Sequence, residues 1–215
     1  LPRQHQHLVA LDQFEDLYAD ARKWLRDGSL DYVAPQLYWP IDPPEQSYPV
    51  LLDWWIEQNT KGRHVVPGLA LYKLPLTTAR RMTSDEITRQ IEITRNTLGA
   101  AGHIHFNARV LMDNVDGIAD RLAQLYAQPA LVPAATWLDK VPPDRPIASA
   151  TRDAQSGGIL VRFAPPARQT VSRWVIQARV NGVWYTRVLP GGDRRHILMG
   201  EPASADLVSI SAVDR

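Results

Sequence analysis

Three short strand-like segments, separated by two amphipathic stretches, constrain the fold of this chain more than any other feature. The segments cover residues 31–38, 65–72 and 102–108, lengths that suit strands better than helices. Between them, residues 48–59 and 83–98 carry apolar side chains three and four positions apart, which predicts helices. Strands that alternate with helices are typical of parallel sheets joined by crossover helices.

Two further helices are expected beside this core. One covers residues 13–27 and ends at Gly28, a residue type that commonly terminates helices. The other covers about residues 116–126. Thr83 and Glu86 have the spacing of a capping box, which predicts that the helix before the third strand begins at Thr83. The expected order is helix, strand, helix, strand, helix, strand, helix.

The character of the chain changes from residue 131 onward, where prolines recur and helical periodicity is lost. Asn181-Gly182 lies between two apolar runs and is a strong hairpin signal. We therefore predict a linker over residues 131–144 and a β-sandwich over residues 145–215. The expected strands cover residues 147–150, 158–163, 173–180, 183–188, 196–199 and 207–213.

Charge and composition exclude several partners. The chain has 24 basic and 23 acidic residues, so no global field attracts nucleic acid, and a neutral partner fits better. No cysteine is present, which removes disulfides and thiolate sites. No apolar run approaches the roughly 20 residues of a membrane helix. The sequence opens at Leu1 rather than methionine, so an upstream segment is expected.

The first strand sorts its side chains onto two faces, because successive residues of a strand point to opposite sides. Its apolar set is Val33, Pro35 and Leu37, which predicts contact with helices. Its other set ends in an amide and a phenol, with an indole at the start of the following loop. This mixture of polar and aromatic groups, which carbohydrate sites favour, is formed by Gln36, Tyr38 and Trp39.

Alternation makes the same kind of prediction for the other two strands. Gly68, Ala70 and Tyr72 share a face of the second strand, with Lys73 just beyond it. On the third strand the alternation predicts that Ile104 and Phe106 point to the helices. The opposite face then carries three polar side chains, those of His103, His105 and Asn107. We expect His103 to have a structural role, and we expect His105 and Asn107 to reach a site.

Five segments in order resemble the C-terminal part of the glycosyl-hydrolase-like family 10 domain, over roughly residues 17–126. They are DARKWLRDGSLDYVAPQLYWP, YPVLLDWWIEQ, VVPGLALYKL, ITRQIEITRN and GHIHFNAR. The resemblance implies an α/β fold, the last three strands of a (β/α)8 TIM barrel within residues 1–130, and a fibronectin type III-like module after it. It also implies activity on a bacterial glycan, including peptidoglycan strands, and a location in the periplasm, the cell envelope or outside the cell.

Three strands of a barrel expose two edges and cannot close it. We therefore expect the first five strands to lie outside this chain, and the fragment alone to be inactive. It is expected to associate with the missing barrel portion or with another chain.

Glycoside hydrolysis commonly needs two carboxyl groups across the scissile bond. The inward faces described above contain none, so the catalytic carboxylates are expected upstream, and Asp42 and Glu45 in the loop after Trp39 are only weak candidates. In a barrel the site lies at the carboxyl ends of the strands. The expected sugar-binding residues there are Gln36, Tyr38, Trp39, Tyr72, Lys73, His105 and Asn107.

Other site types have weak signals. The pair His103 and His105 has no third metal ligand at suitable spacing, so we expect no metal, and no motif predicts a cofactor. Trp55 aligns with the apolar face of its helix and is expected in the core, with Trp54 on the flank. The Arg194-Arg195 pair is expected to be a solvated turn.

Two questions about the function remain open at this point. The chain could belong to a non-catalytic glycan-binding or cell-wall attachment protein whose barrel has lost its acids. For residues 145–215, a structural spacer without a ligand is expected rather than a binding module. Carboxylates at the ends of the earlier strands would separate the hydrolase from the binding protein.

Overall fold

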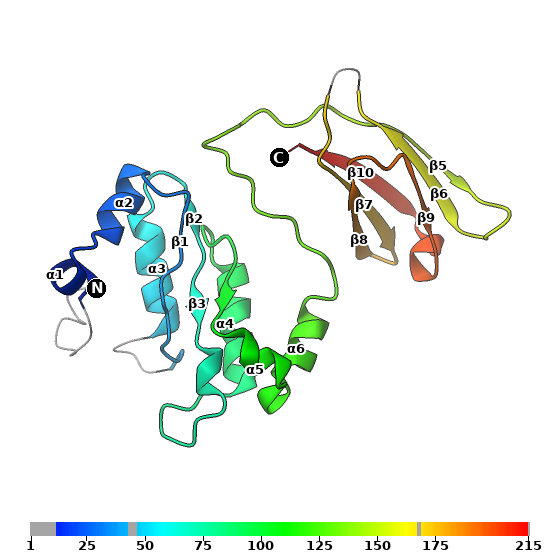
Figure 1. Ribbon diagram of the computed structural model, residues 1–215. Coiled ribbons are helices and arrows are strands. Elements are labelled where there is room, and N and C mark those ends of the chain that lie inside the picture. Colours follow the sequence, from blue (N-terminus) through cyan, green and yellow to red (C-terminus); the bar gives the residue numbers. More distant parts are fainter. Residues whose placement is uncertain (1–11, 43–46, 167–168, 215) are drawn as a thin grey trace. The chain divides into compact units, whose positions relative to one another are not determined.

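The computed structural model describes residues 12–42, 47–166 and 169–214, and the chain divides into two compact units. The first unit comprises Leu1–Leu125 and Val132–Asp139, and the second comprises Tyr126–Leu131 and Lys140–Arg215. Helices and short parallel strands make up the first unit, and antiparallel strands dominate the second (Figure 1).

Three parallel segments form the sheet of the first unit. β1 (Tyr32–Val33) pairs with β2 (His64–Val65), and β3 (Gly68–Leu69) pairs with β4 (Ile104–His105). Two further parallel bridges, Gln36 with Gly68 and Val65 with Ala100, join these pairs into one arrangement. The three predicted parallel strands are thus confirmed, with the second in the middle. Pro67 separates β2 from β3, because proline has no N–H to donate to a ladder.

Helices α3 (Tyr48–Gln58) and α4 (Ser84–Asn96) follow the first and second of these segments, close to the predicted bounds. Thr83 caps α4, because its hydroxyl accepts a hydrogen bond from the Glu86 amide at 3.2 Å. Short helices α5 (Ala108–Met112) and α6 (Ile118–Leu125) follow β4. The buried core of this unit is shared by strands and helices and includes Val33, Leu37, Val65, Leu69, Leu51, Leu52, Ile87 and Ile91.

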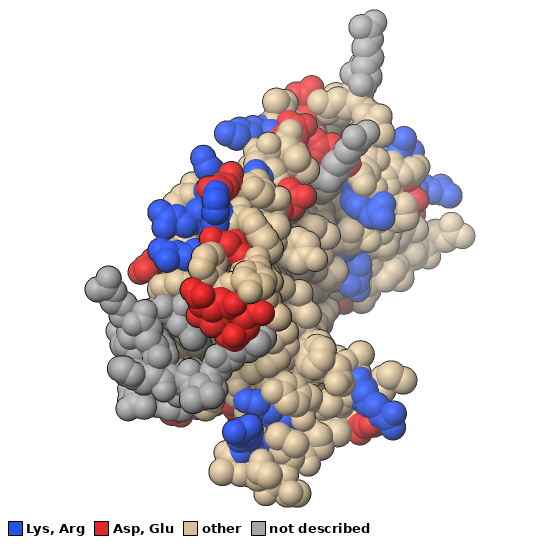
Figure 2. All heavy atoms as spheres, turned by 60° about the vertical axis from the view of Figure 1, so that its left-hand side comes forward, with Lys and Arg blue, Asp and Glu red and all other residues tan. Residues whose placement is uncertain are grey.

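The single helix predicted over residues 13–27 is wrong, because the chain forms two helices there. α1 (Gln13–Leu17) ends where Tyr18 adopts a left-handed conformation, and α2 (Ala21–Asp27) begins after the cap at Asp20. No glycine marks the break, so sequence periodicity continued across it. Acidic and basic side chains gather beside one another on the face that carries these helices, as expected of a solvated surface (Figure 2).

Residues 132–139 lie at the amino ends of the strands of the first unit. The Trp137 indole N–H donates to Asp31 Oδ1 at 2.9 Å, and the Arg63 guanidinium lies 4.7 Å from the centre of the indole ring. The His64 ring meets Trp137 edge-on at 4.7 Å, and His64 Nε2 lies 3.2 Å from the Ala134 carbonyl oxygen. This segment, which we call the Trp137 strap, therefore belongs to the first unit.

Two three-stranded antiparallel sheets form the second unit, in the orders β5-β6-β9 and β10-β7-β8. Both central residues of the β7–β8 turn, Asn181 and Gly182, have positive φ, so the predicted hairpin is confirmed. Side chains of both sheets form one buried core that includes Phe163 and the fully buried Trp174. The strands are β5 (Ile147–Arg152), β6 (Ile159–Ala164), β7 (Arg173–Val180), β8 (Val183–Pro190), β9 (Arg195–Leu198) and β10 (Leu207–Val213).

Candidate functional site

Three aromatic rings meet where the three parallel strands of the first unit end. The ring of Tyr38 lies 5.6 Å from that of Tyr72 and 6.1 Å from that of Phe106, between ring centres. Tyr72 and Phe106 are 6.0 Å apart. Tyr38 and Phe106 are nearly parallel, at 25°, whereas Tyr72 stands edge-on to both. We call these three residues the aromatic cluster.

Gly68 makes room for the Tyr38 ring. A Cβ atom at residue 68 would lie 3.3 Å from Tyr38 Cε1 and 3.6 Å from its hydroxyl oxygen. Because 3.3 Å is a tight contact, a larger residue would push the ring out of its place. The glycine of the second strand therefore helps to set the position of an aromatic side chain from the first.

Two backbone hydrogen bonds and one from a lysine side chain tie the three strand ends together. The Phe106 amide donates to the Leu69 carbonyl and the Tyr72 amide to the Phe106 carbonyl, both at 3.0 Å. Lys73 Nζ donates to the Tyr38 carbonyl oxygen. The second strand was expected to run to Tyr72, but residues 71–73 form a 3-10 turn instead, and this turn brings Tyr72 and Lys73 to the other two strand ends.

The aromatic cluster is only partly covered within this chain. Phe106 is 51% exposed, and Tyr38 and Tyr72 are half-buried. Burial raises the pKa of the Tyr38 phenol, with a further contribution from Tyr72, so the hydroxyl stays protonated at neutral pH. Burial, followed by the nearby charge of Arg80, lowers the pKa of Lys73. The carboxyl ends of the strands thus present apolar ring surface beside hydrogen-bonding groups.

The side chains of the third strand point to the faces opposite to those predicted. Gln36 pairs with Gly68, and Gly68 pairs with Ile104, so Ile104 shares the face of Gln36. His105 pairs with Leu69, which is fully buried on the helix side. The expectation that Ile104 and Phe106 point to the helices is therefore wrong. Both sets of side chains alternate equally well, and only the register decides between them.

The two histidines of the third strand lie in a partly buried environment. Their ring centres are 5.1 Å apart. Burial is the main reason that the pKa of His103 falls to about 4, and the nearby His105 and Arg95 also lower it. Burial also lowers the pKa of His105. Both side chains are neutral at pH 7. This agrees with the structural role expected for His103, and the register does not bring His105 to the aromatic cluster.

The remaining predicted sugar-binding residues occupy different environments. Gln36 is exposed on the face of Gly68. Trp39 is half-buried against the core, and its carbonyl oxygen accepts a hydrogen bond from Gln90 Nε2 at 3.0 Å. Asn107 precedes α5, and its buried Oδ1 has no hydrogen-bond partner among the described residues. The structure therefore brings Tyr38, Tyr72 and Lys73 together most closely.

The structure describes one of the two candidate acids. Asp42 is 81% exposed and lies 3.8 Å from Arg89, in a solvated ion pair. Glu45 lies outside the described residues. The loop after Trp39 is instead held by Glu86, whose carboxylate accepts a hydrogen bond from the Ile41 amide at 2.8 Å and another from Gln90. Sequence reasoning assigned Glu86 only to a helix cap and missed this contact.

Phe106 is the site residue that sequence reasoning missed. It was assigned to the helix side, although an aromatic residue directly before a polar strand end was a usable signal. In the described part of the chain, no three side chains of the types His, Cys, Asp or Glu converge on a point that could hold a metal ion. The same part contains no helix with the length and apolar character needed to cross a membrane.

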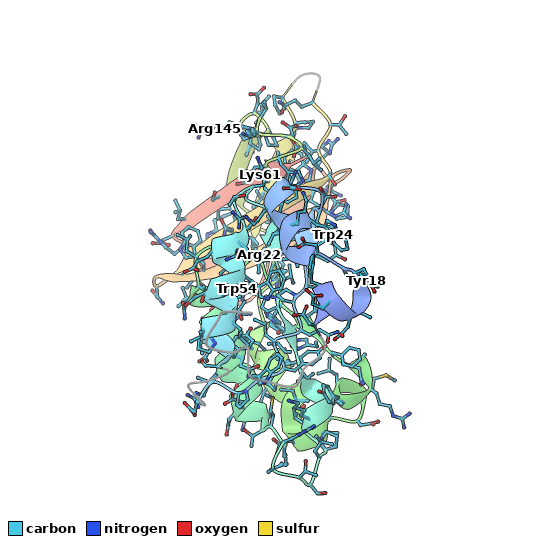
Figure 3. The ribbon with its side chains drawn as sticks, turned by 90° about the vertical axis from the view of Figure 1, so that its left-hand side faces the viewer. Tyr18, Arg22, Trp24, Trp54, Lys61 and Arg145 are labelled. Atoms are coloured by element: carbon cyan, nitrogen blue, oxygen red, sulfur yellow. The ribbon has the colours of Figure 1, made fainter. Side chains whose placement is uncertain are left out.

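The adjacent tryptophans of α3 support the helix rather than the aromatic cluster. Trp55 packs against the core, as predicted. Trp54 meets Trp55 edge-on at 5.2 Å and lies under the Arg22 guanidinium, 5.8 Å from the ring centre. Figure 3 shows Arg22 and Trp54 side by side on this flank. Arg22 also donates to Gln58 Oε1 at 2.8 Å, which fixes α2 against α3.

Comparisons with known proteins agree with the resemblance found in the sequence. Residues 8–83 match the model of the family described as Glycosyl hydrolase-like 10. The chain is 36% identical over 159 residues to glycosyl hydrolase YngK of Bacillus subtilis (strain 168), which covers 73% of this chain and 31% of YngK. It is 41% identical over 63 residues to glycosyl hydrolase DigH of Escherichia coli (strain K12), covering 28% of this chain and 14% of DigH.

These matches support a glycosyl hydrolase-like protein. The chain spans less than a third of the length of these curated relatives. The search of solved structures found no match.

Proposed function

We propose that this chain is the C-terminal part of a glycoside hydrolase-like (β/α)8 barrel that acts on the glycan strands of bacterial peptidoglycan. In this proposal the aromatic cluster binds and orients a sugar, together with Gln36, Trp39 and Lys73. Asn107 adds an amide oxygen that lacks a partner within the described chain. The match to YngK and the matched family model support the reaction class.

The aromatic cluster is the observation that carries the proposal. Three rings from the ends of three neighbouring parallel strands meet at one place, and each remains partly uncovered. An aromatic face packs well on the C–H surface of a sugar, and a phenol supplies a polar tip for its hydroxyls. A ligand that covered these rings would also remove apolar surface from water.

The catalytic carboxylates are assigned to strands outside this chain. Hydrolysis commonly needs a carboxylic acid and a second carboxylate about 5 to 10 Å apart. Asp42, the only candidate acid from sequence that the structure describes, is solvated. This chain would therefore provide part of the sugar-binding wall, and the rest of the barrel would provide the acids.

The test uses the full-length protein and purified glycan strands, with release of reducing ends as the readout of hydrolysis. Tyr38→Ala and Phe106→Ala should each lower kcat/KM about 10-fold to 100-fold, while circular dichroism stays unchanged. Tyr18→Ala is the control, because Tyr18 is a 91% exposed tyrosine at the end of α1 and not at a strand end. Unchanged kcat/KM in both cluster variants would overturn the assignment.

A second candidate is a non-catalytic glycan-binding protein of the cell wall. The environment of Asp42 favours it, because this candidate acid, the only one of the two within the described residues, is held in a solvated ion pair with Arg89. Equilibrium binding to the same glycan strands distinguishes the two functions. Binding that depends on Phe106 without release of reducing ends would support this candidate over the hydrolase.

We also propose that the second unit is a fibronectin type III-like β-sandwich and that the protein works in the periplasm, in the cell envelope or outside the cell. Two antiparallel sheets with a common core support the first part. The second part is supported by the family resemblance and by the glycan substrate that we propose.

A further inference from the structure

We propose that the second unit contains a binding site for phosphate groups, formed by Arg162, Arg194 and Arg195. This proposal is independent of the glycan site. It concerns the two arginines that follow Gly192 and Asp193, a pair that sequence analysis assigned to a solvated turn.

The first observation is a pair of like charges placed directly opposite each other. Arg162 of the central strand β6 is the register partner of Arg195 on β9, and both side chains are exposed. Side chains in such pairs lie about 5 Å apart at Cβ, and like charges there are destabilising. On the other side of Arg162, the register partner on β5 is Ser149, which does not compensate the charge.

The second observation is a hollow in the surface at the same place. It has a volume of about 590 Å³ and is open to solvent. Three of its five lining residues are the arginines, and the other two are Gly192 and Asp193. An added Cβ at Gly192 would meet no atom within 4 Å, so the backbone there is accessible. Since the arginines outnumber the single lining acid, the hollow carries a net positive charge.

The third observation is that Arg194 is already held in place. Its Nη1 donates to the carbonyl oxygens of Gly191 and Asp193, at 2.7 and 2.6 Å. Its own carbonyl accepts a hydrogen bond from the Phe163 amide at 3.0 Å, which ties the turn to β6. A guanidinium that is held in this way loses less conformational entropy when it binds an anion.

The fourth observation is a contrast within the same unit. Arg179 forms an ion pair with Asp206, at 3.0 Å between Nη2 and Oδ2. Among the described residues, none of the three arginines of the hollow takes part in an ion pair within 4.0 Å. Asp153 lies near enough for Arg162 to contribute to its lowered pKa, but the main cause of that shift is its hydrogen bond from Ser156.

Phosphate fits this arrangement better than a carboxylate does. A phosphate group carries up to two charges and three strong acceptor oxygens that point in different directions, so one group can meet several guanidinium groups. A carboxylate carries one charge and two coplanar oxygens. A phosphate between Arg162 and Arg195 would also neutralise the repulsion between them.

The test titrates the full chain with pyrophosphate at low salt and measures binding by calorimetry. We expect saturable binding at submillimolar to millimolar concentrations, weakened at least 10-fold by the double substitution Arg162→Gln and Arg195→Gln. Arg179→Gln is the matched control, because it removes an arginine of the same unit that is already paired, and it should leave binding unchanged. Circular dichroism checks that each variant is folded.

Two further measurements keep the proposal open to refutation. Without ligand, Arg195→Gln should raise the melting temperature of the second unit, because it removes the repulsion from Arg162. Succinate should bind at least 10-fold more weakly than pyrophosphate. The proposal is overturned if pyrophosphate does not bind at 10 mM, if the double variant binds it as the wild type does, or if succinate binds equally well.

Discussion

The two ends of the parallel strands in the first unit differ in how completely the chain itself covers them. At the amino ends, the Trp137 strap contacts Asp31, Arg63 and His64 through a hydrogen bond, a cation–π contact and a ring contact. At the carboxyl ends, the rings of the aromatic cluster contact one another and stay partly uncovered. The same three strands therefore have one end with a structural covering and one end suited to a ligand.

This difference matches a general property of parallel α/β folds, in which ligands bind at the carboxyl ends of the strands. The rings show this difference, whereas buried polar atoms without a partner in the described chain occur at both ends. At the amino end, Arg63 donates from Nη2 to the Gly28 carbonyl at 2.9 Å, and Asp31 accepts from the indole, but Arg63 Nε and Nη1 have no partner. At the carboxyl end, the same holds for Asn107 Oδ1. Substitutions at the two ends should therefore change different properties of the protein.

The largest effect is expected from Gly68→Val at the carboxyl end. Because a Cβ at residue 68 already makes a tight contact with Tyr38, the branched side chain should displace the ring. A displacement of about 1 Å in a binding group can lower activity about 100-fold. We expect a loss of that size in kcat/KM for glycan hydrolysis by the full-length protein, measured by release of reducing ends.

Gly68→Ala provides the graded control for this substitution, because it adds only the Cβ and should cause a smaller loss. Circular dichroism and urea unfolding check that the fold is retained. If Gly68→Val hydrolysed glycan at the wild-type rate with the fold intact, the aromatic cluster would not be the functional end of the strands.

The second effect tests which face of the third strand packs against the helices. We expect it as a dependence of the stability of the first unit on pH, through His103. The pKa of His103 is about 4 in the folded chain, against an ordinary value near 6.5. Between these values the unfolded chain binds the proton and the folded chain does not, so stability falls as the pH falls from about 6.5 to about 4. The free energy of unfolding of the first unit should decrease by up to about 3 kcal/mol in this window.

Urea unfolding at several pH values, compared between the wild type and His103→Gln, measures this contribution. The variant should lose most of the dependence on pH in that window, because glutamine does not titrate. Equal pH dependence in both proteins would mean that His103 faces solvent, and would reopen the assignment of the third strand to the helix side.

A third, smaller effect is expected at the amino end. Trp137→Ala removes the indole from Arg63 and His64 and leaves Asp31 without its donor, which should lower the free energy of unfolding of the first unit by about 2 kcal/mol. Limited proteolysis should then cut within residues 132–139 more quickly. Glycan turnover by the full-length protein should change less than 2-fold, and a loss as large as that of Gly68→Val would contradict the structural role of the strap.

The sequence could predict part of the difference between the two strand ends. It succeeded where neighbouring side chains differ clearly in polarity and the apolar set identifies the buried face. The first strand alternates between apolar and polar residues, and the structure confirms that Val33 and Leu37 are buried while Gln36 is exposed. The third strand alternates as clearly, with His105 on one face and Ile104 and Phe106 on the other, but alternation alone does not tell which face meets the helices. Its phase is set by pairing with Leu69, which lies 36 residues away in the sequence. Tertiary register therefore decided what local pattern could not.

The remaining features that sequence reasoning missed also depend on distant partners. Trp137 lies in a proline-rich segment, where its contact with Asp31 could not be recognised from neighbouring residues. The opposition of Arg162 and Arg195 likewise follows from the β6–β9 register and not from local sequence. In contrast, the Asn181-Gly182 hairpin was predictable, because its conformation is encoded by the two turn residues themselves.

The smallest effect is expected from a substitution that removes the hydrogen bond at the amino end and keeps an aromatic ring there. Trp137→Phe keeps an aromatic ring beside Arg63 and His64 but removes the N–H that donates to Asp31. Since this hydrogen bond is exposed, we expect a loss of only about 0.5 to 1 kcal/mol in the free energy of unfolding. A double-mutant cycle with Asp31→Ala should give a coupling energy of the same size. A coupling energy near zero would show that ring contacts alone hold the strap. The amino end would then resemble the aromatic cluster, because contacts between rings would stabilise both ends of the strands.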